Sequence, residues 1–382
     1  MVEQPSDGDP IAFARPFFGE AEAEAAADVV RSAWVVGGPR LQEFERRFAE
    51  RCGAAHAVGV SSWTTGAFLV LHAWGVGPGD EVIVPSLTFI ASANVIRHAG
   101  ATPVFAEIDP STFNIDPTDA AKKITARTRV LMPVDQIGLP CDIDAINALA
   151  RRHGLRVLDD AACAFAARNR GRPVGSLAEI SVFSLHARKV ITCGEGGMIV
   201  TDDAALAERL RSLRHQGMSL SDFARRDMRP TAFESYPEIG YNHRITDIQA
   251  AIGLRQLDRL DEILRLRREI ARRYTAALAE NSVLAPPYVP DGIEPNWQSY
   301  QVTLRRDAKL SRNAAMDRLF DLGIPTRRGV MASHLEPPYR GEGVVLPVTE
   351  AVAASTLQLP MHAGLTPSQQ SRVIEALRSL ER

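Results

Sequence analysis

Cysteine is scarce in this chain, with four among 382 residues. Cys52, Cys141, Cys163 and Cys193 are scattered, and no two are spaced as Cys-x-x-Cys. This spacing argues against a disulfide framework and against a zinc site built from paired cysteines. No two histidines lie at metal-ligand spacing either. We therefore expect reduced thiols, a cytoplasmic location and no metal.

A strong charge of one sign and long apolar runs are also missing. The formal net charge is −2, which gives no electrostatic reason to expect nucleic acid or an anionic membrane as a partner. No stretch reaches the roughly 18 apolar residues of a membrane span. The first ten residues are acidic and lack an apolar core, so we do not expect a signal peptide.

What the chain does have is an alternation of helical and strand patterns in a composition that is 45% hydrophobic and 24% charged. The alternation predicts an α/β fold with a large, mostly parallel sheet that helices cover on both faces. The predicted helices span 20–32, 40–52, 64–74, 89–98, 142–153 and 204–214, and the predicted strands span 56–60, 81–84, 102–105, 130–134, 156–159 and 197–201.

The pattern changes beyond residue 245. Residues 245–278 read as one long helix rich in Leu, Ile and Arg, which suggests a link between two domains. An alternating run at 300–304 and helices at 312–322 and 367–380 predict a smaller α+β C-terminal domain. We therefore expect a flexible tail at 1–14, a large domain at 15–255 and a small domain at 256–382.

The most informative residue is Lys189, which lies in a loop before Gly194-Glu195-Gly196-Gly197. Upstream, an apolar strand pattern ends in Asp159 and Asp160. A lysine that holds an aldehyde and an acid that keeps a ring nitrogen protonated are what pyridoxal phosphate chemistry needs. Side chains alternate along a strand, so only one of the two aspartates can face such a site. The residues alone leave both as candidates.

Three other segments have both a functional and an ordinary structural reading. The segment 61–67 lies between a strand and a helix, where Ser62 or Thr64 can cap the helix or the helix start can bind an anion. Phe89 follows a strand end, where an aromatic can stack on a planar cofactor or belong to the core. Asn242 and Arg244 precede a helix and can be plain surface residues.

Together these segments resemble the DegT/DnrJ/EryC1/StrS family of sugar aminotransferases, which are fold-type-I enzymes that use pyridoxal 5′-phosphate. The resemblance runs from about residue 15 to the C-terminus. Several landmarks in one order over this length make it specific. They are the segments 77–85 (Gly-Pro-Gly-Asp-Glu-Val-Ile-Val-Pro), 113–116 (Phe-Asn-Ile-Asp), 159–162 (Asp-Asp-Ala-Ala), 194–197 (Gly-Glu-Gly-Gly), 240–242 (Gly-Tyr-Asn) and 246–253 (Thr-Asp-Ile-Gln-Ala-Ala-Ile-Gly).

The resemblance implies a role for each matching residue. Lys189 corresponds to the lysine that forms the Schiff base, and Asp160 to the acid that meets the pyridine nitrogen. The remaining positions contact the cofactor's phosphate, ring or phenolic oxygen. They are Thr64, Thr65 and Ser184 at the phosphate, Phe89 over the ring, Cys163 near the phenolic oxygen, and Asn242, which reaches the phosphate of a neighbouring subunit. This last role implies a homodimer with shared active sites.

The chain departs from the family pattern at three positions. Trp63 stands where glycine is common, so its ring must point away from the phosphate or reshape the substrate entrance. Cys163, a weak hydrogen-bonding group, stands where glutamine or histidine is frequent. Asp135 occupies a turn in which the family often has histidine.

The resemblance implies an aminotransferase that moves an amino group, most often from L-glutamate, to a keto sugar, a nucleotide-linked keto sugar or a keto cyclitol. A carboxylated or phosphorylated acceptor is an alternative, because the paired arginines at 327 and 328 can hold such groups. A regulator that binds the cofactor without turnover is another. The candidate substrate contacts are Trp34, Arg244, Arg328 and His334.

Overall fold

The computed structural model describes residues 6, 8–220, 225, 229, 231, 233–341 and 343–381. In the first half of the chain its elements are α1 (Glu20–Arg31), α2 (Pro39–Cys52), β1 (His56–Val60), α3 (Trp63–Ala73), β2 (Glu81–Pro85), α4 (Ala91–His98), β3 (Thr102–Ala106), α5 (Pro117–Lys122), β4 (Thr128–Leu131), η1 (Gln136–Gly138), α6 (Ile143–His153), β5 (Arg156–Asp160), β6 (Arg168–Asn169), β7 (Arg172–Pro173) and β8 (Ile180–Ser184). The second half contains β9 (Gly197–Thr201), α7 (Ala204–Leu213), α9 (Asp247–Asp258), α10 (Leu260–Leu278), β10 (Leu284–Ala285), β11 (Ile293–Glu294), β12 (Tyr300–Leu304), α11 (Arg312–Asp321), β13 (Arg327–Arg328), η2 (Ser333–Leu335), α12 (Pro347–Ser355), β14 (Thr356–Leu359) and α13 (Pro367–Ser379).

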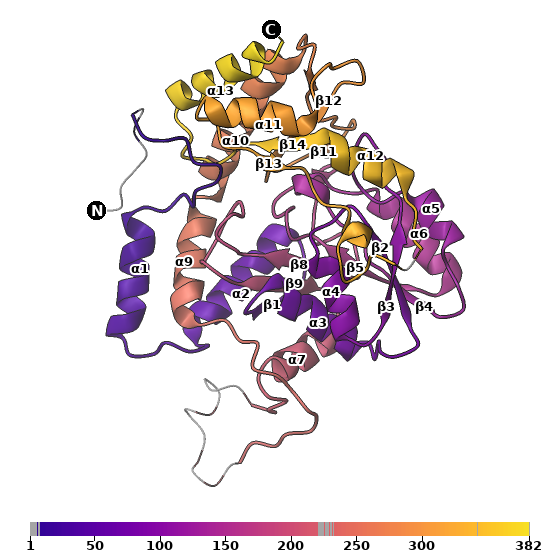
Figure 1. Ribbon diagram of the computed structural model, residues 1–382. Helices are drawn as coiled ribbons and strands as arrows, with labels where there is room; N and C mark the ends of the chain where they lie inside the picture. Colours follow the sequence, from indigo (N-terminus) through magenta and orange to yellow (C-terminus); the bar gives the residue numbers. More distant parts are fainter. Residues whose placement is uncertain are drawn as a thin grey trace.

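The large domain is built on a seven-stranded sheet with the order β1-β9-β8-β5-β4-β2-β3 (Figure 1). The pairs from β8 to β3 are parallel, and β9 runs antiparallel to both of its neighbours. The predicted α/β fold with a mostly parallel sheet is therefore confirmed. β5 ends at Asp160 and β8 ends at Ser184. Because the two strands are parallel, both residues lie at the same edge of the sheet.

Helices cover both faces of this sheet, and successive side chains of each strand enter different cores. Val182 belongs to a core with residues of α3, α4 and α7, whereas Phe183 belongs to a core with residues of α2 and α9. Within the second core, Phe48 stacks on Phe165 with ring centroids 4.3 Å apart. This two-sided packing explains why the strands read as nearly continuous apolar runs.

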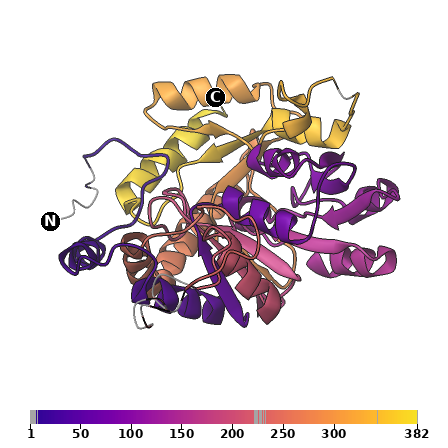
Figure 2. The ribbon, with the colours of Figure 1, turned by 90° about the horizontal axis from the view of Figure 1, so that it is seen from below.

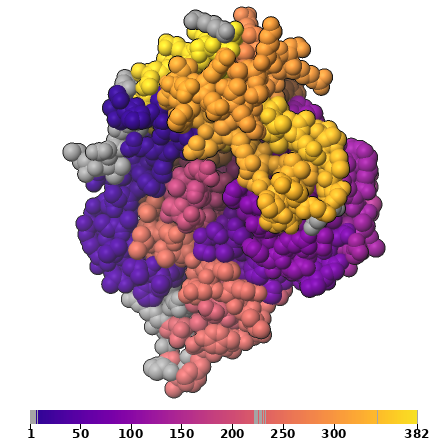
Figure 3. Space-filling view, in the orientation of Figure 1, coloured from indigo at the N-terminus to yellow at the C-terminus, as the bar shows by residue number. Residues whose placement is uncertain are grey.

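The small domain contains a four-stranded antiparallel sheet with the order β10-β12-β14-β13. Its helices α10, α11 and α13 pack against this sheet in a core of their own. Figures 1 and 2 show this domain, orange to yellow, lying across the large domain, and Figure 3 shows the two in close contact. A separate small sheet joins them, because β11 pairs with β6 of the large domain.

The prediction of one long helix at 245–278 is wrong in one respect, because the structure has two helices there. α9 ends at Asp258 and α10 begins at Leu260, with Arg259 between them at φ −101° and ψ 2°. The guanidinium of Arg259 lies over the ring of Phe17, 4.3 Å from its centroid, and donates to the Phe17 carbonyl oxygen. No proline or glycine marks this break, so the pattern of apolar residues gave no signal for it.

Part of the predicted N-terminal tail packs against the small domain. Ile11 is 6% exposed and belongs to the core of that domain. The backbone N–H of Met361 donates to the carbonyl oxygen of Phe13. Residues 1–5 and 7 of that tail lie outside the described residues.

The helix α9 also organises the start of α2. The buried carboxylate of Asp247 accepts hydrogen bonds from the backbone N–H groups of Gly38 and Leu41, at 2.8 and 3.0 Å. These N–H groups lie at the start of α2, where no residue of the helix itself can accept their bonds.

Among the described residues, no helix is both long and apolar enough to cross a membrane.

Candidate active site

Asp160 ends β5 and is 3% exposed. Ser92 of α4 donates to its Oδ2 atom at 2.7 Å, and the backbone N–H of Ala162 donates to Oδ1 at 3.2 Å. Burial raises the pKa of Asp160 to about 6, while the Ser92 hydrogen bond, the Ala162 N–H and the charge of Lys189 act in the opposite direction. The site therefore contains a buried carboxylate that a nearby cation helps to ionise.

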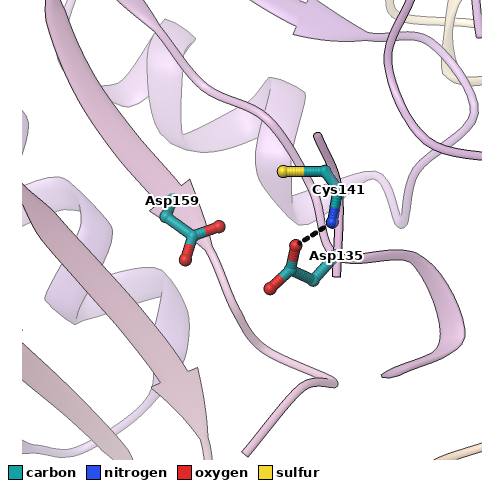
Figure 4. A group of neighbouring side chains, drawn as sticks. All are labelled: Asp135, Cys141 and Asp159. Atoms are coloured by element: carbon teal, nitrogen blue, oxygen red, sulfur yellow. Dashed lines mark hydrogen bonds between the residues drawn. The ribbon is translucent and has the colours of Figure 1, made fainter. Parts of the chain in front are cut away.

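Asp159 faces the other side of β5, as the alternation along the strand requires. Its Oδ2 atom accepts a hydrogen bond from Ser181 at 2.8 Å, away from Lys189. One of its carboxylate oxygens lies within 4.8 Å of the side-chain ligand atoms of Asp135 and Cys141 (Figure 4). The residues alone left both aspartates open, and the geometry places Asp160, the one that the resemblance implies, beside the lysine.

Lys189 lies in the loop between β8 and β9, and its Nζ atom is 3.1 Å from Sγ of Cys163. The ends of this loop are closed by backbone bonds from Leu185 to Gly196 and from Cys193 to Leu185. A connector from the small domain holds the middle, where Gln298 donates to the carbonyl oxygen of Arg188 at 2.6 Å. The loop therefore presents Lys189 in a fixed place between two domains.

The N-terminus of α3 lies beside this loop. Ser62 is the N-cap residue, and its Oγ accepts the backbone N–H of Thr65 while the Thr65 hydroxyl accepts the N–H of Ser62. The ordinary capping reading is therefore correct for Ser62. The N–H groups of Trp63 and Thr64 precede the first bond within the helix and point out of its start. An anion can bind here together with the cap.

The strand β9 approaches this helix start very closely. A Cβ atom on Gly197 would lie 2.5 to 2.7 Å from backbone atoms of Ser62 and Trp63. Only glycine fits at that distance. The Trp63 side chain is 6% exposed and belongs to the core that also contains residues of α4 and α7, so it points away from the helix start. Of the two possibilities for Trp63, the structure shows that its ring points away.

Three further residues were predicted to contact the cofactor. Phe89 follows β2 and is 61% exposed, so its ring is free to cover a planar ligand. Ser184 ends β8, two residues before His186, whose N–H donates to its hydroxyl at 3.4 Å. Asn242 is exposed and pairs with His215 in an isolated β-bridge, and its role at the cofactor stays a prediction.

The four predicted substrate contacts each have partners within the chain. His334 is 2% exposed, with its Nδ1 atom 2.6 Å from the Ser86 hydroxyl and its Nε2 atom 3.3 Å from Glu350. Arg328 pairs with Glu336 at 3.1 Å, and Arg244 bonds to the His215 ring. Trp34 packs closely against Gly38. Each side chain is thus engaged within the chain itself, and their role at a substrate stays a prediction.

Asp135, Cys141 and Asp159 form a buried group behind the site (Figure 4). The N–H of Cys141 donates to Asp135 at 2.8 Å. Burial raises the pKa of Asp135 to about 7 and that of Asp159 well above its usual range. Both shifts favour the protonated forms of these buried acids. Spacing in the sequence could not show this group, because Asp159 lies on β5 while Asp135 and Cys141 lie in the connection between β4 and α6.

Sequence reasoning also missed Ser92 and the connector residues Asn296 and Gln298. Asn296 donates to the carbonyl oxygens of Cys163 and Phe165, at 2.7 and 2.9 Å. The only signal for Ser92 was its place in the helix that follows the Phe89 loop. Asn296 and Gln298 lie more than a hundred residues from the loops that they hold, and no local pattern marks such contacts.

These residues fit pyridoxal 5′-phosphate in three respects. Lys189 offers an amine, Asp160 offers a buried carboxylate whose ionisation the lysine favours, and the helix start beside Gly197 offers N–H groups for a phosphate. Asp160 and Lys189 are close enough for their charges to interact. Cys163 touches the amine of Lys189 and would therefore lie beside a ligand held there.

Comparison with known proteins agrees with this reading. The model of the DegT/DnrJ/EryC1/StrS aminotransferase family matches residues 16–378. The chain is 42% identical over 376 residues to GDP-perosamine synthase of Caulobacter vibrioides, which covers 97% of this chain and 98% of that protein.

Solved structures give the same result. The structure is similar to DesI in the presence of its TDP-sugar product, with a TM-score of 0.89, 35% identity and coverage of 99% and 94% of the two chains. It is also similar to the PLP form of Spr1654, a putative sugar aminotransferase of Streptococcus pneumoniae, with a TM-score of 0.90, 28% identity and coverage of 98% and 99%. The chain belongs to the DegT/DnrJ/EryC1/StrS family and is an aminotransferase whose cofactor is pyridoxal 5′-phosphate.

Proposed function

We propose that this aminotransferase transfers an amino group from L-glutamate to a nucleotide-linked keto sugar, with Lys189 and Asp160 as its catalytic residues. The observation that carries the proposal is the position of Lys189 beside the buried carboxylate of Asp160. Family members that dehydrate sugars have histidine in place of this lysine, and the nearest histidine here, His186, is three residues away.

Pyridoxal phosphate, when bound, supplies an electron sink for the bonds around the amino-bearing carbon. The chain supplies the proton transfers. The amine of Lys189 takes the proton from Cα of the donor and returns one to the acceptor carbon in the reverse half of the reaction. The carboxylate of Asp160 holds a proton at the ring nitrogen, and Ser92 keeps that carboxylate oriented. The N–H groups at the start of α3 fix the phosphate.

The nucleotide-linked acceptor rests on the relatives. GDP-perosamine synthase carries a nucleotide sugar in its name, and DesI was solved with a TDP-sugar product. The alternative of a free carboxylated or phosphorylated acceptor is weaker, because both arginines proposed for it have partners in the chain. Arg328 pairs with Glu336, and Arg327 lies over the ring of Phe13.

A cytoplasmic location accords with four free thiols.

The acceptor is tested by a matched panel with L-glutamate as donor. Each keto sugar is offered with and without its nucleotide, beside keto cyclitols and phosphorylated and carboxylated carbonyl compounds, and the aminated product is measured by mass spectrometry. We expect amination of nucleotide-linked keto sugars at a much higher kcat/KM than of the free sugars. Equal rates on free sugars, or preference for a carboxylated acceptor, would contradict the nucleotide-linked assignment.

We also propose a homodimer in which Asn242 serves the site of the other subunit. The exposed position of Asn242 supports this arrangement. Lys189→Ala and Asn242→Ala variants are each expected to have greatly reduced activity. When the two are unfolded and refolded together, a hybrid dimer then contains one intact site, so part of the activity returns. If Lys189 and Asn242 act within one subunit, the mixture stays as inactive as the separate variants. Refolded single variants are the controls.

A further inference from the structure

Lys189 and Cys163 are in direct contact, and the proposed function leaves this contact without a role. Nζ of Lys189 lies 3.1 Å from Sγ of Cys163, and both side chains are half-buried. Cys163 differs in this from the other three cysteines, Cys52, Cys141 and Cys193, which are all buried. The thiol that touches the catalytic amine is therefore also the most accessible to a small solute.

One connector of the small domain holds both partners of this contact in place. Asn296 donates to the carbonyl oxygen of Cys163 at 2.7 Å, and Gln298 donates to that of Arg188, the neighbour of Lys189, at 2.6 Å. The two residues are also bonded to each other, because the N–H of Gln298 donates to Oδ1 of Asn296 at 2.8 Å. The two loops cannot drift apart without breaking these bonds, so the side chains of Cys163 and Lys189 remain neighbours.

We propose that Cys163 and Lys189 are an oxidative modification site, at which a peroxide links Sγ to Nζ through a covalent sulfur–nitrogen bond. In the first step the Cys163 sulfur attacks one peroxide oxygen. A sulfur–oxygen bond forms, the oxygen–oxygen bond breaks, and water leaves, so that the thiol becomes a sulfenic acid. In the second step the neutral amine of Lys189 attacks the sulfur. A sulfur–nitrogen bond forms, the sulfur–oxygen bond breaks, and a second water leaves.

The balance is one thiol, one amine and one hydrogen peroxide giving one sulfenamide and two waters. The protein loses two hydrogens and gains no oxygen. Sulfenic acids are known to condense with a nearby thiol or nitrogen, and here the nearby nitrogen is Nζ. A dithiol reverses the link, because its thiolate attacks Sγ and releases the amine. The link takes away the amine that the reaction needs, so oxidation stops turnover without unfolding the protein.

The contrast with Cys193 gives a matched control. Cys193 lies in the same loop as Lys189, but it is buried, and burial raises its pKa to about 12. Its sulfur donates to the carbonyl oxygen of Glu195, away from the lysine. Because reaction with peroxide needs an accessible thiolate, Cys193 should stay unmodified under conditions that modify Cys163.

The test treats the purified holoenzyme with hydrogen peroxide, with and without L-glutamate, which frees the Lys189 amine during its half of the reaction. Intact mass and peptide mapping follow the product. We expect a peptide that joins the segments of Cys163 and Lys189, more of it with L-glutamate, and its loss after dithiothreitol. Cys163→Ser should give no linked peptide, whereas Cys193→Ser should give as much as the wild type. Activity after peroxide is compared with that of the same untreated variant.

The linked peptide is read without any sugar substrate, so the result does not depend on the acceptor proposed above. Absence of the linked peptide under both conditions overturns the proposal, whether Cys163 is found unchanged or with added oxygen. A disulfide between subunits in its place overturns it as well.

Discussion

Ser92 controls the ionisation of Asp160 from the neighbouring helix. Its hydroxyl donates to Oδ2 of Asp160 at 2.7 Å and lies 2.8 Å from the hydroxyl of Thr88, so the two form a short chain that ends on the carboxylate. Each hydroxyl group can donate only one hydrogen. Once Asp160 is ionised, the Ser92 hydroxyl donates to it and therefore accepts from Thr88. The carboxylate then has a partner that favours its charged form.

We expect Ser92→Ala to raise the pKa of Asp160 above its value of about 6. A hydrogen bond to a charged group contributes about 1.5–3 kcal/mol, so the affinity for pyridoxal phosphate should fall about tenfold or more near pH 6. The loss should shrink at higher pH, where the carboxylate ionises even without Ser92. Cofactor titrations by fluorescence across a pH series measure both effects.

The control for this variant is Thr88→Val, which leaves the Ser92 hydroxyl in place and should cause a smaller loss. A loss of affinity in Ser92→Ala that is the same at every pH would contradict the assigned role. It would point instead to a packing defect at a residue that is only 2% exposed.

Sequence reasoning reached the central pair of residues but not their surroundings. Asp160 and Lys189 were predicted together because their residue types and their order along the chain match a known chemistry. The choice of Asp160 over Asp159 came from the family resemblance, since alternation shows that the two differ but not which one faces the lysine, and the geometry agrees with that choice. Ser92 could not be predicted, because a serine in a helix carries no signal of what it contacts.

The loop from β8 to β9 and the start of α3 fit together only because β9 begins with glycine. A Cβ atom on Gly197 would lie 2.5 Å from the carbonyl carbon of Ser62. The close approach brings the helix start, where the phosphate is expected to bind, beside the loop that carries Lys189. The last glycine of the Gly-Glu-Gly-Gly sequence, Gly197, is thus required for steric reasons.

We expect Gly197→Ala to push β9 and the start of α3 apart and to weaken cofactor binding about tenfold or more, since removal of even one good phosphate contact costs about 1.5–3 kcal/mol. Equilibrium dialysis with pyridoxal phosphate measures the affinity. The matched control is Gly77→Ala, where the nearest atom to the new Cβ is the Ala99 carbonyl oxygen at 3.9 Å. Unchanged affinity in Gly197→Ala would show that phosphate binding at the start of α3 does not depend on this close approach.

Most elements of the sheet were predictable, because each strand is buried on both sides and reads as an apolar run. The strands β1, β9 and β12 begin and end where the sequence predicted. The break at Arg259 was not predictable, since it depends on contacts with Phe17 and Glu22 more than two hundred residues away. The same holds for Ile11, whose burial depends on a domain formed by the other end of the chain.

The buried acids Asp135 and Asp159 make the stability of the whole molecule depend on pH. Asp135 lies beside Cys141 and Asp159. Burial raises its pKa to about 7, and the negative charge of Asp160 acts in the same direction. The fold favours the protonated form of such an acid. Its contribution is therefore fully present below the pKa of about 4 of an unfolded aspartate and is lost as the pH rises through about 7. His362, whose pKa burial lowers to about 4, acts in the opposite direction between about pH 4 and 6.5.

We expect Asp135→Asn to remove this loss, because an asparagine can still accept the N–H of Cys141 and can also donate to the carboxylate of Asp159. The wild-type free energy of unfolding should fall relative to that of the variant by up to about 1.4 kcal/mol per pH unit between pH 5 and 7, the slope for one proton. Urea unfolding of the cofactor-free proteins at several pH values measures the difference, and His362 cancels from it because both proteins contain it. Parallel curves across this range would show that Asp135 is already ionised in the folded protein.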